Sequence, residues 1–388
     1  MKRYIVIVAA VAMQMCLGGL YAWSAFVPAL REEFGYSATQ TQLVFGTCIL
    51  VFTLSMVFTG RLHDRFGPRL LATASSLLFS SGYFLVWYGG GALIWLWLGY
   101  GVFVGMGIGC GYICAIATPV KWFPRRKGLV SGISVAGYGA GAIVLANLAH
   151  LLLTRGWSVL EIFGCVGLLY GPIVLISGTC LFLPGLQTGN KVIEFRRRVL
   201  LSDRRFWQLC MGMFFGTMPG IMINGSLMHM GLSFGFTAGV ATAAISFFAI
   251  GNASGRIVCG FLHDRLGGSR SIKLVLSLVA VSTIGVLLGR DCGPGFIGAA
   301  WLVGFSYGSN FALYPAQVAE LYGTEVMGTV YALVILVHGL GAQLGPGLGG
   351  LSFDMTGSYL PAVVGAFAAT VIGLTGYAYL GRRKQDER

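Results

Sequence analysis

Charged side chains are scarce in this chain. Asp, Glu, Lys and Arg make up only 10% of its 388 residues, and 13 of them are acidic. A soluble domain carries about 25% charged residues. Hydrophobic residues make up 56%, and there are 60 glycines. This composition excludes an ordinary soluble protein.

Several chemical signatures are also missing. The sequence has no G-x-x-x-x-G-K-[ST] segment, and GLQTGNK at Gly185–Lys191 has the wrong spacing, so nothing indicates direct use of ATP. It shows no paired catalytic carboxylates, nucleophile triad or zinc cluster, which makes an enzyme a poor interpretation. The nine cysteines form no C-x-x-C pair, and we interpret them as small packing residues. We therefore expect no metal site and no cofactor.

Long apolar runs are the main feature that is present. Twelve runs are long enough to cross a bilayer as helices. They begin near Tyr4, Thr39, Leu70, Ala92, Leu129, Val159, Trp207, Val240, Ile272, Gly295, Thr329 and Tyr359. This pattern predicts an all-α membrane protein with twelve transmembrane helices and no folded extramembrane domain. The first run, Tyr4–Val27, is too long for a signal-peptide core, so we expect it to remain as a span.

The net charge of +13 follows from the position of the basic residues. If the loops alternate from a cytoplasmic N-terminus, 22 of the 26 Lys and Arg fall on the inner side, and only Arg31, Arg155 and Arg290 fall outside. This positive-inside pattern predicts that both termini are cytoplasmic. The excess of basic residues then reflects how the chain is oriented in the membrane. The expected partner is therefore the lipid bilayer and not nucleic acid.

The chain contains an internal repeat. GRLHDRFGPR at Gly60–Arg69 recurs 200 residues later as GFLHDRLGGSR at Gly260–Arg270. Six spans per repeat in the same orientation are the plan of a transporter built from two parallel repeats. We predict an N-terminal six-helix bundle over residues 1–186, a cytoplasmic linker over 187–205 and a C-terminal six-helix bundle over 206–388.

The repeated motif carries a family resemblance. Its G-x-L-x-D-R-x-G pattern resembles the signature of the major facilitator superfamily, in which it forms a cytoplasmic gate between helices. The resemblance implies the major facilitator fold. It assigns the gate role to Gly60, Asp64, Arg65, Gly260, Asp264 and Arg265. The residue types fit, because glycine permits close helix approach and an Asp–Arg pair can bridge or cap helix ends. A generic polar turn is the alternative.

Arg256 is the one charged side chain in the interior of a span. No Asp or Glu lies deep in any span to neutralise it, and its counterpart in the first repeat is Met56. A charge at this depth costs about 2.5–3.5 kcal/mol, so by default it marks a functional site, here for an anionic ligand. The alternative is snorkelling, because Asp264 is only about 12 Å away along the helix.

Two further features narrow the resemblance. GGLYAWSAF at Gly18–Phe26 resembles the opening helix of the branch that contains oxalate/formate antiporters and monocarboxylate transporters. Arg256 sits where that branch carries its substrate-binding arginine, which implies a small carboxylate substrate. Asn252, one turn earlier, lies where proton-coupled monocarboxylate transporters of animals usually have an aspartate. Asparagine cannot titrate, which puts a coupling role for this position in doubt.

His338 is the second candidate residue. It lies mid-span in Tyr331–Gly347, near the lysine that oxalate/formate antiporters use. Two fixed cations suit a dicarboxylate, whereas one arginine with a titratable imidazole suits a single carboxylate. Because an imidazole has an ordinary pKa of ~6.5, His338 is the candidate proton carrier. A neutral histidine that is hydrogen-bonded to its surroundings is the alternative.

Aromatic residues can complete the cavity. Tyr307 and Phe311 share one face of the tenth span, and Tyr112 is a near-symmetric counterpart of Tyr307 in the fourth. A phenol can donate to a carboxylate without adding charge. These residues need no function if they are only packing aromatics. Tyr21 and Asn224 are weaker candidates.

Four polar residues lie near the outer ends of spans. We expect them to be solvated: His150, Glu161, His229 and Asp354.

The predicted function is secondary transport of a small monocarboxylate such as lactate or pyruvate, with proton symport. Exchange of carboxylates, as in oxalate/formate antiporters, is the first alternative. A membrane sensor that binds a carboxylate without moving it is the second. We expect an integral protein of the bacterial cytoplasmic membrane. The oligomeric state is open, and a monomer is favoured.

Overall fold

The computed structural model describes residues 2–123, 127–183, 197–323 and 327–382. All the regular elements in these ranges are helices. Twelve helical segments are long and apolar enough to cross a membrane, and each begins within about four residues of a predicted start. The predicted all-α membrane fold with twelve spans is confirmed.

The first six spans are built from ten elements. These are α1 (Lys2–Gly18), η1 (Gly19–Ala25), α2 (Val27–Phe34), α3 (Ala38–Phe66), α4 (Pro68–Tyr88), α5 (Leu93–Leu96), η2 (Trp97–Val104), α6 (Gly105–Trp122), α7 (Lys127–Thr154) and α8 (Val159–Thr179). A short helix, α9 (Arg197–Ser202), falls within the predicted linker, whose residues 187–196 lie outside the described ranges. The last six spans are α10 (Arg204–Ser233), α11 (Ala238–Leu266), α12 (Gly268–Leu288), α13 (Gly293–Tyr322), α14 (Met327–Thr356) and α15 (Leu360–Arg382).

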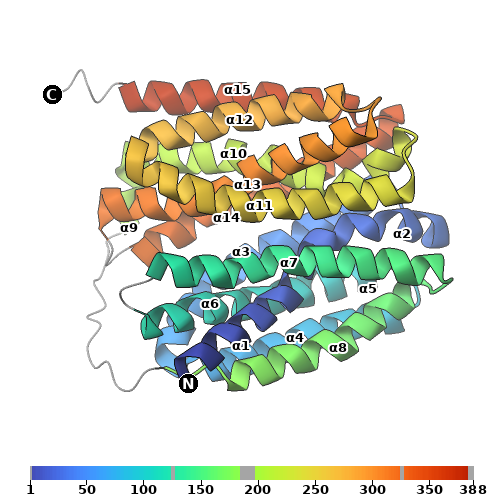
Figure 1. Cartoon of the computed structure of the whole chain (residues 1–388), viewed down its shortest axis with the longest axis horizontal. Helices are drawn as coiled ribbons and strands as arrows, with labels where there is room; N and C mark the ends of the chain where they lie inside the picture. Colours follow the sequence, from blue (N-terminus) through green and yellow to red (C-terminus); the bar gives the residue numbers. More distant parts are fainter. Residues whose placement is uncertain (1, 124–126, 184–196, 324–326, 383–388) are drawn as a thin grey trace.

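The helices of the two halves form two adjacent groups. In Figure 1, α1, α4, α6, α7 and α8 lie together on one side, and α11 to α15 lie on the other. The groups meet where α3 packs against α14 and where α7 packs against α11. The start of α1 and the end of α15 lie at the same end of the bundle in this view (Figure 1).

The repeat is visible in the helix bounds. α11 and α12 begin and end 200 residues after α3 and α4. The motif glycines that follow, Gly67 and Gly267, have φ angles of 79° and 78°. Each donates its N–H to a histidine carbonyl of the preceding helix, His63 or His263, at 2.9 Å. Only glycine adopts this backbone region at little cost, so the last glycine of each motif ends its helix.

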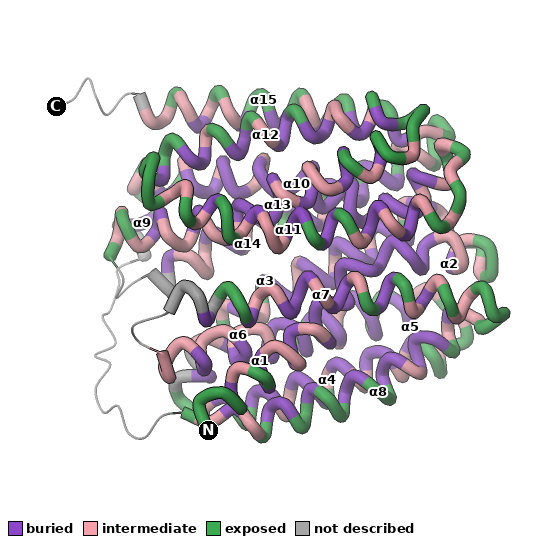
Figure 2. Tube along the Cα trace, in the orientation of Figure 1, coloured by how far each residue is buried: buried purple, intermediate pink, exposed green. Residues whose placement is uncertain are grey.

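Burial follows the pattern of a protein surrounded by lipid. Buried positions line the interior of the bundle, and exposed positions follow the outward helix faces in Figure 2. Many exposed side chains are large and apolar, among them Leu77, Leu168 and Ile372. Inside, small residues allow close packing, since a Cβ added at Gly105 of α6 would lie 2.6 Å from the Cys48 carbonyl oxygen of α3.

Two spans depart from regular α geometry. The first continues from α1 into a 3₁₀ segment, η1, and the fourth contains a π segment, η2. Such segments are short and often lie at functional positions. The η1 segment carries Tyr21 and faces α7, α10 and α11, so it brings an aromatic hydroxyl to the contact between the halves.

Candidate functional site

Arg256 extends from α11 into the contact between the halves. It is half-buried, and its Nε donates a hydrogen bond to Asn252 Oδ1 at 2.9 Å. The guanidinium lies 5.0 Å from the centre of the Phe311 ring of α13, and it is within hydrogen-bonding reach of Tyr112 on α6. An arginine above an aromatic ring gains a cation–π contact. Residues that the sequence predicts for one site therefore lie together.

The direction of this side chain bears on the snorkelling alternative. Asn252 is one turn before Arg256, whereas Asp264 lies in the last turn of α11. Because helical side chains tilt toward the N-terminus, the guanidinium lies on the side away from Asp264. Snorkelling toward the Asp264 end requires the opposite direction.

Three tyrosines from the first half surround the guanidinium. The Tyr21 hydroxyl is 3.0 Å from the hydroxyl of Tyr307, which joins η1 to α13 across the two halves. Tyr138 of α7 makes edge contacts with Tyr21 and Tyr112, each with ring centres 5.4 Å apart. The Tyr138 hydroxyl is buried and has no hydrogen-bond partner among the described residues. A buried unpartnered hydroxyl is costly unless a ligand or water satisfies it.

An apolar wall completes this cluster. Phe311 packs on Tyr307 with ring centres 5.1 Å apart, and Phe248 lies 5.8 Å from the same tyrosine. In the first half, Phe52 lies 5.3 Å from Tyr112. The arrangement combines one cation and several hydroxyls with aromatic faces, which suits a small anion that has an apolar end.

His338 lies on α14, beside the aromatic wall. Its ring centre is 5.1 Å from that of Phe311, and the residue is 1% exposed. His338 Nδ1 is 3.0 Å from the Thr217 hydroxyl, and that hydroxyl donates to the Met213 carbonyl at 2.7 Å. A hydroxyl has one proton to donate, so Thr217 accepts from Nδ1–H. The neutral imidazole then keeps a lone pair on Nε2, where a proton can bind.

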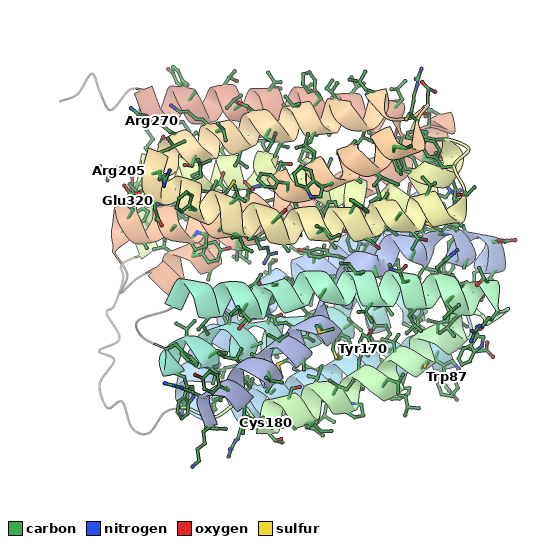
Figure 3. The ribbon with its side chains drawn as sticks, in the orientation of Figure 1. Trp87, Tyr170, Cys180, Arg205, Arg270 and Glu320 are labelled. Carbon is green, nitrogen blue, oxygen red and sulfur yellow. The ribbon has the colours of Figure 1, made fainter. Side chains whose placement is uncertain are left out.

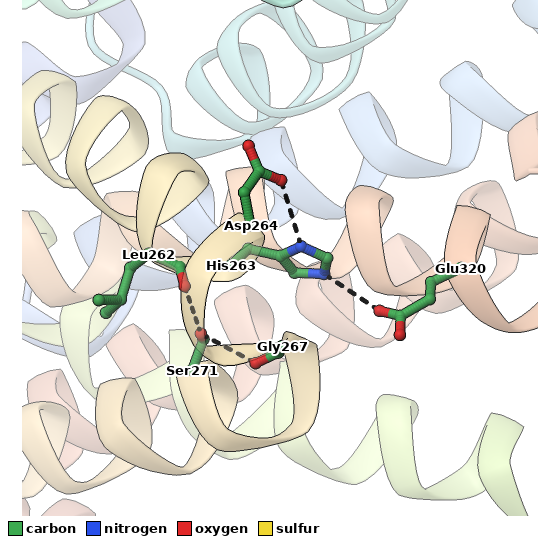
Figure 4. A network of polar contacts seen from close by, with 6 residues as sticks. All are labelled: Leu262, His263, Asp264, Gly267, Ser271 and Glu320. Carbon is green, nitrogen blue, oxygen red and sulfur yellow. Dashed lines mark hydrogen bonds and ion pairs between the residues drawn. The ribbon is translucent and has the colours of Figure 1, made fainter.

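The repeated motifs lie at the end of the bundle that we call the motif end, defined by Gly67 and Gly267. Arg205, Arg270 and Glu320 also lie at this end in Figure 3, whereas Trp87 lies at the other. Figure 4 shows His263 between two carboxylates, with Nδ1 3.8 Å from Asp264 and Nε2 3.6 Å from Glu320 of α13.

The predicted gate residues differ in how closely they contact other residues. Arg65 and Arg265 stack on neighbouring phenylalanine rings at 5.2 Å and 4.3 Å. The described residues show no close helix approach at Gly60 or Gly260. Among them, a Cβ at Gly260 would meet no atom within 4 Å, and one at Gly60 would meet only Ile113 at 3.6 Å. The Asp64 side chain lies outside the described residues.

At the opposite end of the bundle, which contains Arg31, His229 and Asp354, polar contacts join the halves. Asp354 of α14 accepts bonds from the N–H groups of Ala38 and Thr39, both at 2.8 Å, at the start of α3. A carboxylate at a helix N-terminus is favourable. Asp354 is exposed, as predicted, and it also contacts α3. His229 is only partly exposed and contacts Tyr359, so its solvated position is not confirmed.

Comparison with known proteins identifies the family. A sequence model of the Major Facilitator Superfamily matches residues 6–346. The chain belongs to this superfamily. An uncharacterized MFS-type transporter of Escherichia coli K12, YhjX, is 29% identical, with 88% of this chain and 86% of the relative covered.

Two relatives have names that match the predicted branch of the superfamily. The oxalate:formate antiporter of Oxalobacter formigenes is 25% identical to this chain, with 98% of this chain and 93% of the relative covered. Human monocarboxylate transporter 11 is 27% identical, with 91% and 77% covered. The predicted resemblance to this branch is confirmed. The protein is thus an integral membrane protein of a family of transporters, which are not enzymes.

The sequence missed parts of this transporter's site. Tyr138 and Phe248 were not predicted, because an aromatic residue in an aromatic-rich span gives no local signal. Thr217 was not predicted as the partner of His338. Asn224, a weaker candidate, donates to the Tyr21 backbone carbonyl at 3.4 Å. The Oδ1 atom of its buried side chain has no hydrogen-bond partner among the described residues, and only the tertiary structure could show this.

Proposed function

We propose that this protein is a proton-coupled secondary transporter of small monocarboxylates such as lactate or pyruvate. Arg256 is the observation that carries the proposal. It is a cation deep in a span, and its described partners are an amide, a phenol and an aromatic ring, none of which balances its charge. A bound carboxylate supplies that balance and gains charge-assisted hydrogen bonds.

The remaining polar groups suit the rest of such a ligand. Because Asn252 Oδ1 accepts from Arg256, its Nδ2 is a donor, and it has no partner among the described residues. The free hydroxyl of Tyr138 lies on the other side, in the first half. A 2-hydroxy or 2-oxo carboxylate has an additional oxygen for such groups, and its short apolar end fits against Phe248 and Phe311.

His338 supplies a place for the proton. Its Nε2 has a lone pair when Nδ1 donates to Thr217. A carboxylate bound at Arg256 lowers the electrostatic cost of a second positive charge, so anion and proton favour each other's binding. The site loaded with both is closer to neutral overall than the site loaded with a proton alone.

Transport requires that the site open alternately to the two sides. We place the motif end in the cytoplasm, because Arg205, Arg270, the start of α1 and the end of α15 lie there, and we place the opposite end outside. The two bundles, residues 1–186 and 206–388, then rock about the site, joined by the linker 187–205. The motif residues form the cytoplasmic gate. We place a monomer of this protein in a bacterial cytoplasmic membrane.

Counterflow in proteoliposomes tests this function. Vesicles loaded with unlabelled lactate are expected to accumulate external labelled lactate, and Arg256→Gln is expected to abolish the accumulation. A membrane sensor would bind lactate without counterflow. Wild-type flux retained in Arg256→Gln would show that the arginine does not hold the substrate.

Exchange of carboxylates is the second candidate, favoured by the similarity to the oxalate:formate antiporter. An imposed pH gradient, in vesicles that contain no internal anion, separates the two modes. Symport predicts uptake that follows the gradient. Exchange predicts uptake that needs an internal anion and ignores the gradient.

A further inference from the structure

A histidine joins the two halves at the opposite end of the bundle. His229 lies on α10, and its Nε2 contacts a guanidinium nitrogen of Arg31 on α2. Its Nδ1 is 2.8 Å from the hydroxyl of Tyr359, just before α15. The Arg31 guanidinium also lies 5.0 Å from the centre of the Phe353 ring of α14. One side chain of the first half thus contacts two residues of the second, and Tyr359 holds the histidine from the other side.

This contact has only one consistent arrangement of protons. A guanidinium is always charged and can only donate, so His229 Nε2 must accept from Arg31 with a lone pair. The ring proton then sits on Nδ1 and is donated to the Tyr359 oxygen. Burial raises the pKa of the Tyr359 phenol, so its hydroxyl stays neutral. The contact therefore requires a neutral imidazole.

We propose that His229 is a proton-operated latch that holds the two halves together at this end. A proton on Nε2 removes the acceptor for Arg31 and places two cations in direct contact. Separation of the halves moves the imidazole away from Arg31, so the proton binds more tightly to the separated state. By linkage, acid then favours opening of this end.

The surroundings of His229 allow a proton to reach its imidazole. Among the charges near that imidazole, Arg31 is the one that opposes its protonation most directly. A hollow of about 620 Å³ lies beside the latch and is lined by residues of α2, α10 and α14. The titratable and charged groups of the packed elements that face this region are Arg31, Glu32, Tyr36, Asp354 and Tyr359. Asp354 is already engaged by the N-terminus of α3. It is a second cross-half contact, separate from that of His229.

The latch goes beyond the proposed function. It needs only the contact between the halves, and its external location rests on the proposed topology. Its test therefore measures distance and not transport, so that failure of transport and failure of the latch are separate results.

Spin labels on the full chain in lipid nanodiscs report the opening. One label is placed at Arg155→Cys, in the first half, and the other at the native exposed Cys292, in the second. Cys165→Ser and Cys180→Ser remove the partly exposed thiols. We expect the population with the longer distance to rise several-fold between about pH 7.5 and about pH 5, a range that brackets the ordinary imidazole pKa of ~6.5.

Substitutions then show which residue is responsible for the change of distance with pH. His229→Gln is neutral and can still accept from Arg31, so we expect the short distance at both pH values. His229→Lys is charged at both and is expected to show the long distance throughout. His150→Gln, a histidine at the same end that makes no part of the latch, is expected to keep the response. Arg31→Gln removes the second cation and is expected to reduce it.

The result that overturns the latch is equally direct. A pH response that persists in His229→Gln would assign the opening to another group. A wild-type distance distribution that does not change with pH would show that no such latch operates.

Discussion

The two halves of this transporter have the same scaffold and different chemistry. α3 and α11 have identical bounds 200 residues apart. At matched positions, α3 has Phe52 and Met56, whereas α11 has Asn252 and Arg256. The first half contributes the phenols of Tyr21, Tyr112 and Tyr138 to the site. The second contributes the cation, the amide and the imidazole.

This difference teaches that the repeat preserves the helical scaffold, whereas the charged and polar side chains of the proposed site lie where the repeat is broken. A symmetric site with arginine at both positions would place two cations near one small ligand. One cation against a wall of neutral hydroxyls instead matches a ligand with one negative charge. In the proposed site, the hydroxyls can donate to such a ligand without adding a charge that must be buried.

The largest expected effect on lactate binding comes from removing the charge of Arg256, which only the second half carries. Arg256→Gln should weaken lactate binding by at least an order of magnitude, because loss of one partner of a buried charge pair costs about 2–5 kcal/mol. Calorimetric titration of the purified protein measures this. Met56→Gln, the same new side chain at the matched position of the first half, is the control and should bind nearly as wild type. Equal losses in both variants would refute the asymmetry.

A second prediction separates the imidazole from the guanidinium. His338→Gln should retain lactate counterflow and lose the response of uptake to a pH gradient, because an amide cannot take up a proton. Initial uptake rates at several imposed gradients provide the measurement. Thr217→Val, which removes only the hydroxyl that orients the imidazole, should keep a shifted pH response. Gradient-driven uptake that is unchanged in His338→Gln would assign the proton to another group.

The contact between Tyr21 and Tyr307 tests whether the halves interact through the site itself. Tyr21→Phe and Tyr307→Phe should each reduce affinity by roughly 2- to 10-fold, the scale of one hydrogen bond of about 1 kcal/mol. In the double variant the losses should not add, because both changes remove the same 3.0 Å contact. Additive losses in a double-mutant cycle would show that each hydroxyl acts alone.

The smallest expected effect is at the unpartnered hydroxyl. Tyr138→Phe should leave thermal stability unchanged or slightly raised, because no described group loses a hydrogen bond. Lactate affinity should nevertheless fall a few-fold, since the hydroxyl is available to the ligand. Phe248→Tyr is a useful companion, since it adds a hydroxyl on the second half. A stability loss without a change in affinity would make Tyr138 a packing residue.

Much of the fold was predictable because lipid imposes a simple rule. Each span must be apolar and must satisfy its backbone internally, so runs of apolar residues mark helices directly. Arg256 was predictable for the same reason, as an exception to that rule. The gate role of Gly60 and Gly260 stays a prediction. A motif shows which residues recur and not how closely two helices approach at one position, and the described residues show no close approach there.

The site was only partly predictable, because its members come from spans that are remote from one another in the sequence. Tyr138 has no neighbour in sequence that marks it, and its importance depends on a hydroxyl that packing leaves without a partner. The tautomer of His338 depends on Thr217, which lies on another helix. The contact of His229 with Arg31 depends on how two span ends meet.

By itself, the sequence determined the twelve spans, the twofold repeat and the presence of one isolated charge, because hydropathy and residue identity act locally along the chain. Only the tertiary structure decided which way Arg256 points, which hydroxyls lie near it and which side chains join the two halves at the end opposite the motifs. Those properties depend on distances between helices that are remote in sequence. Hydrogen bonds and cation–π contacts act over a few ångströms, and only packing brings their partners that close.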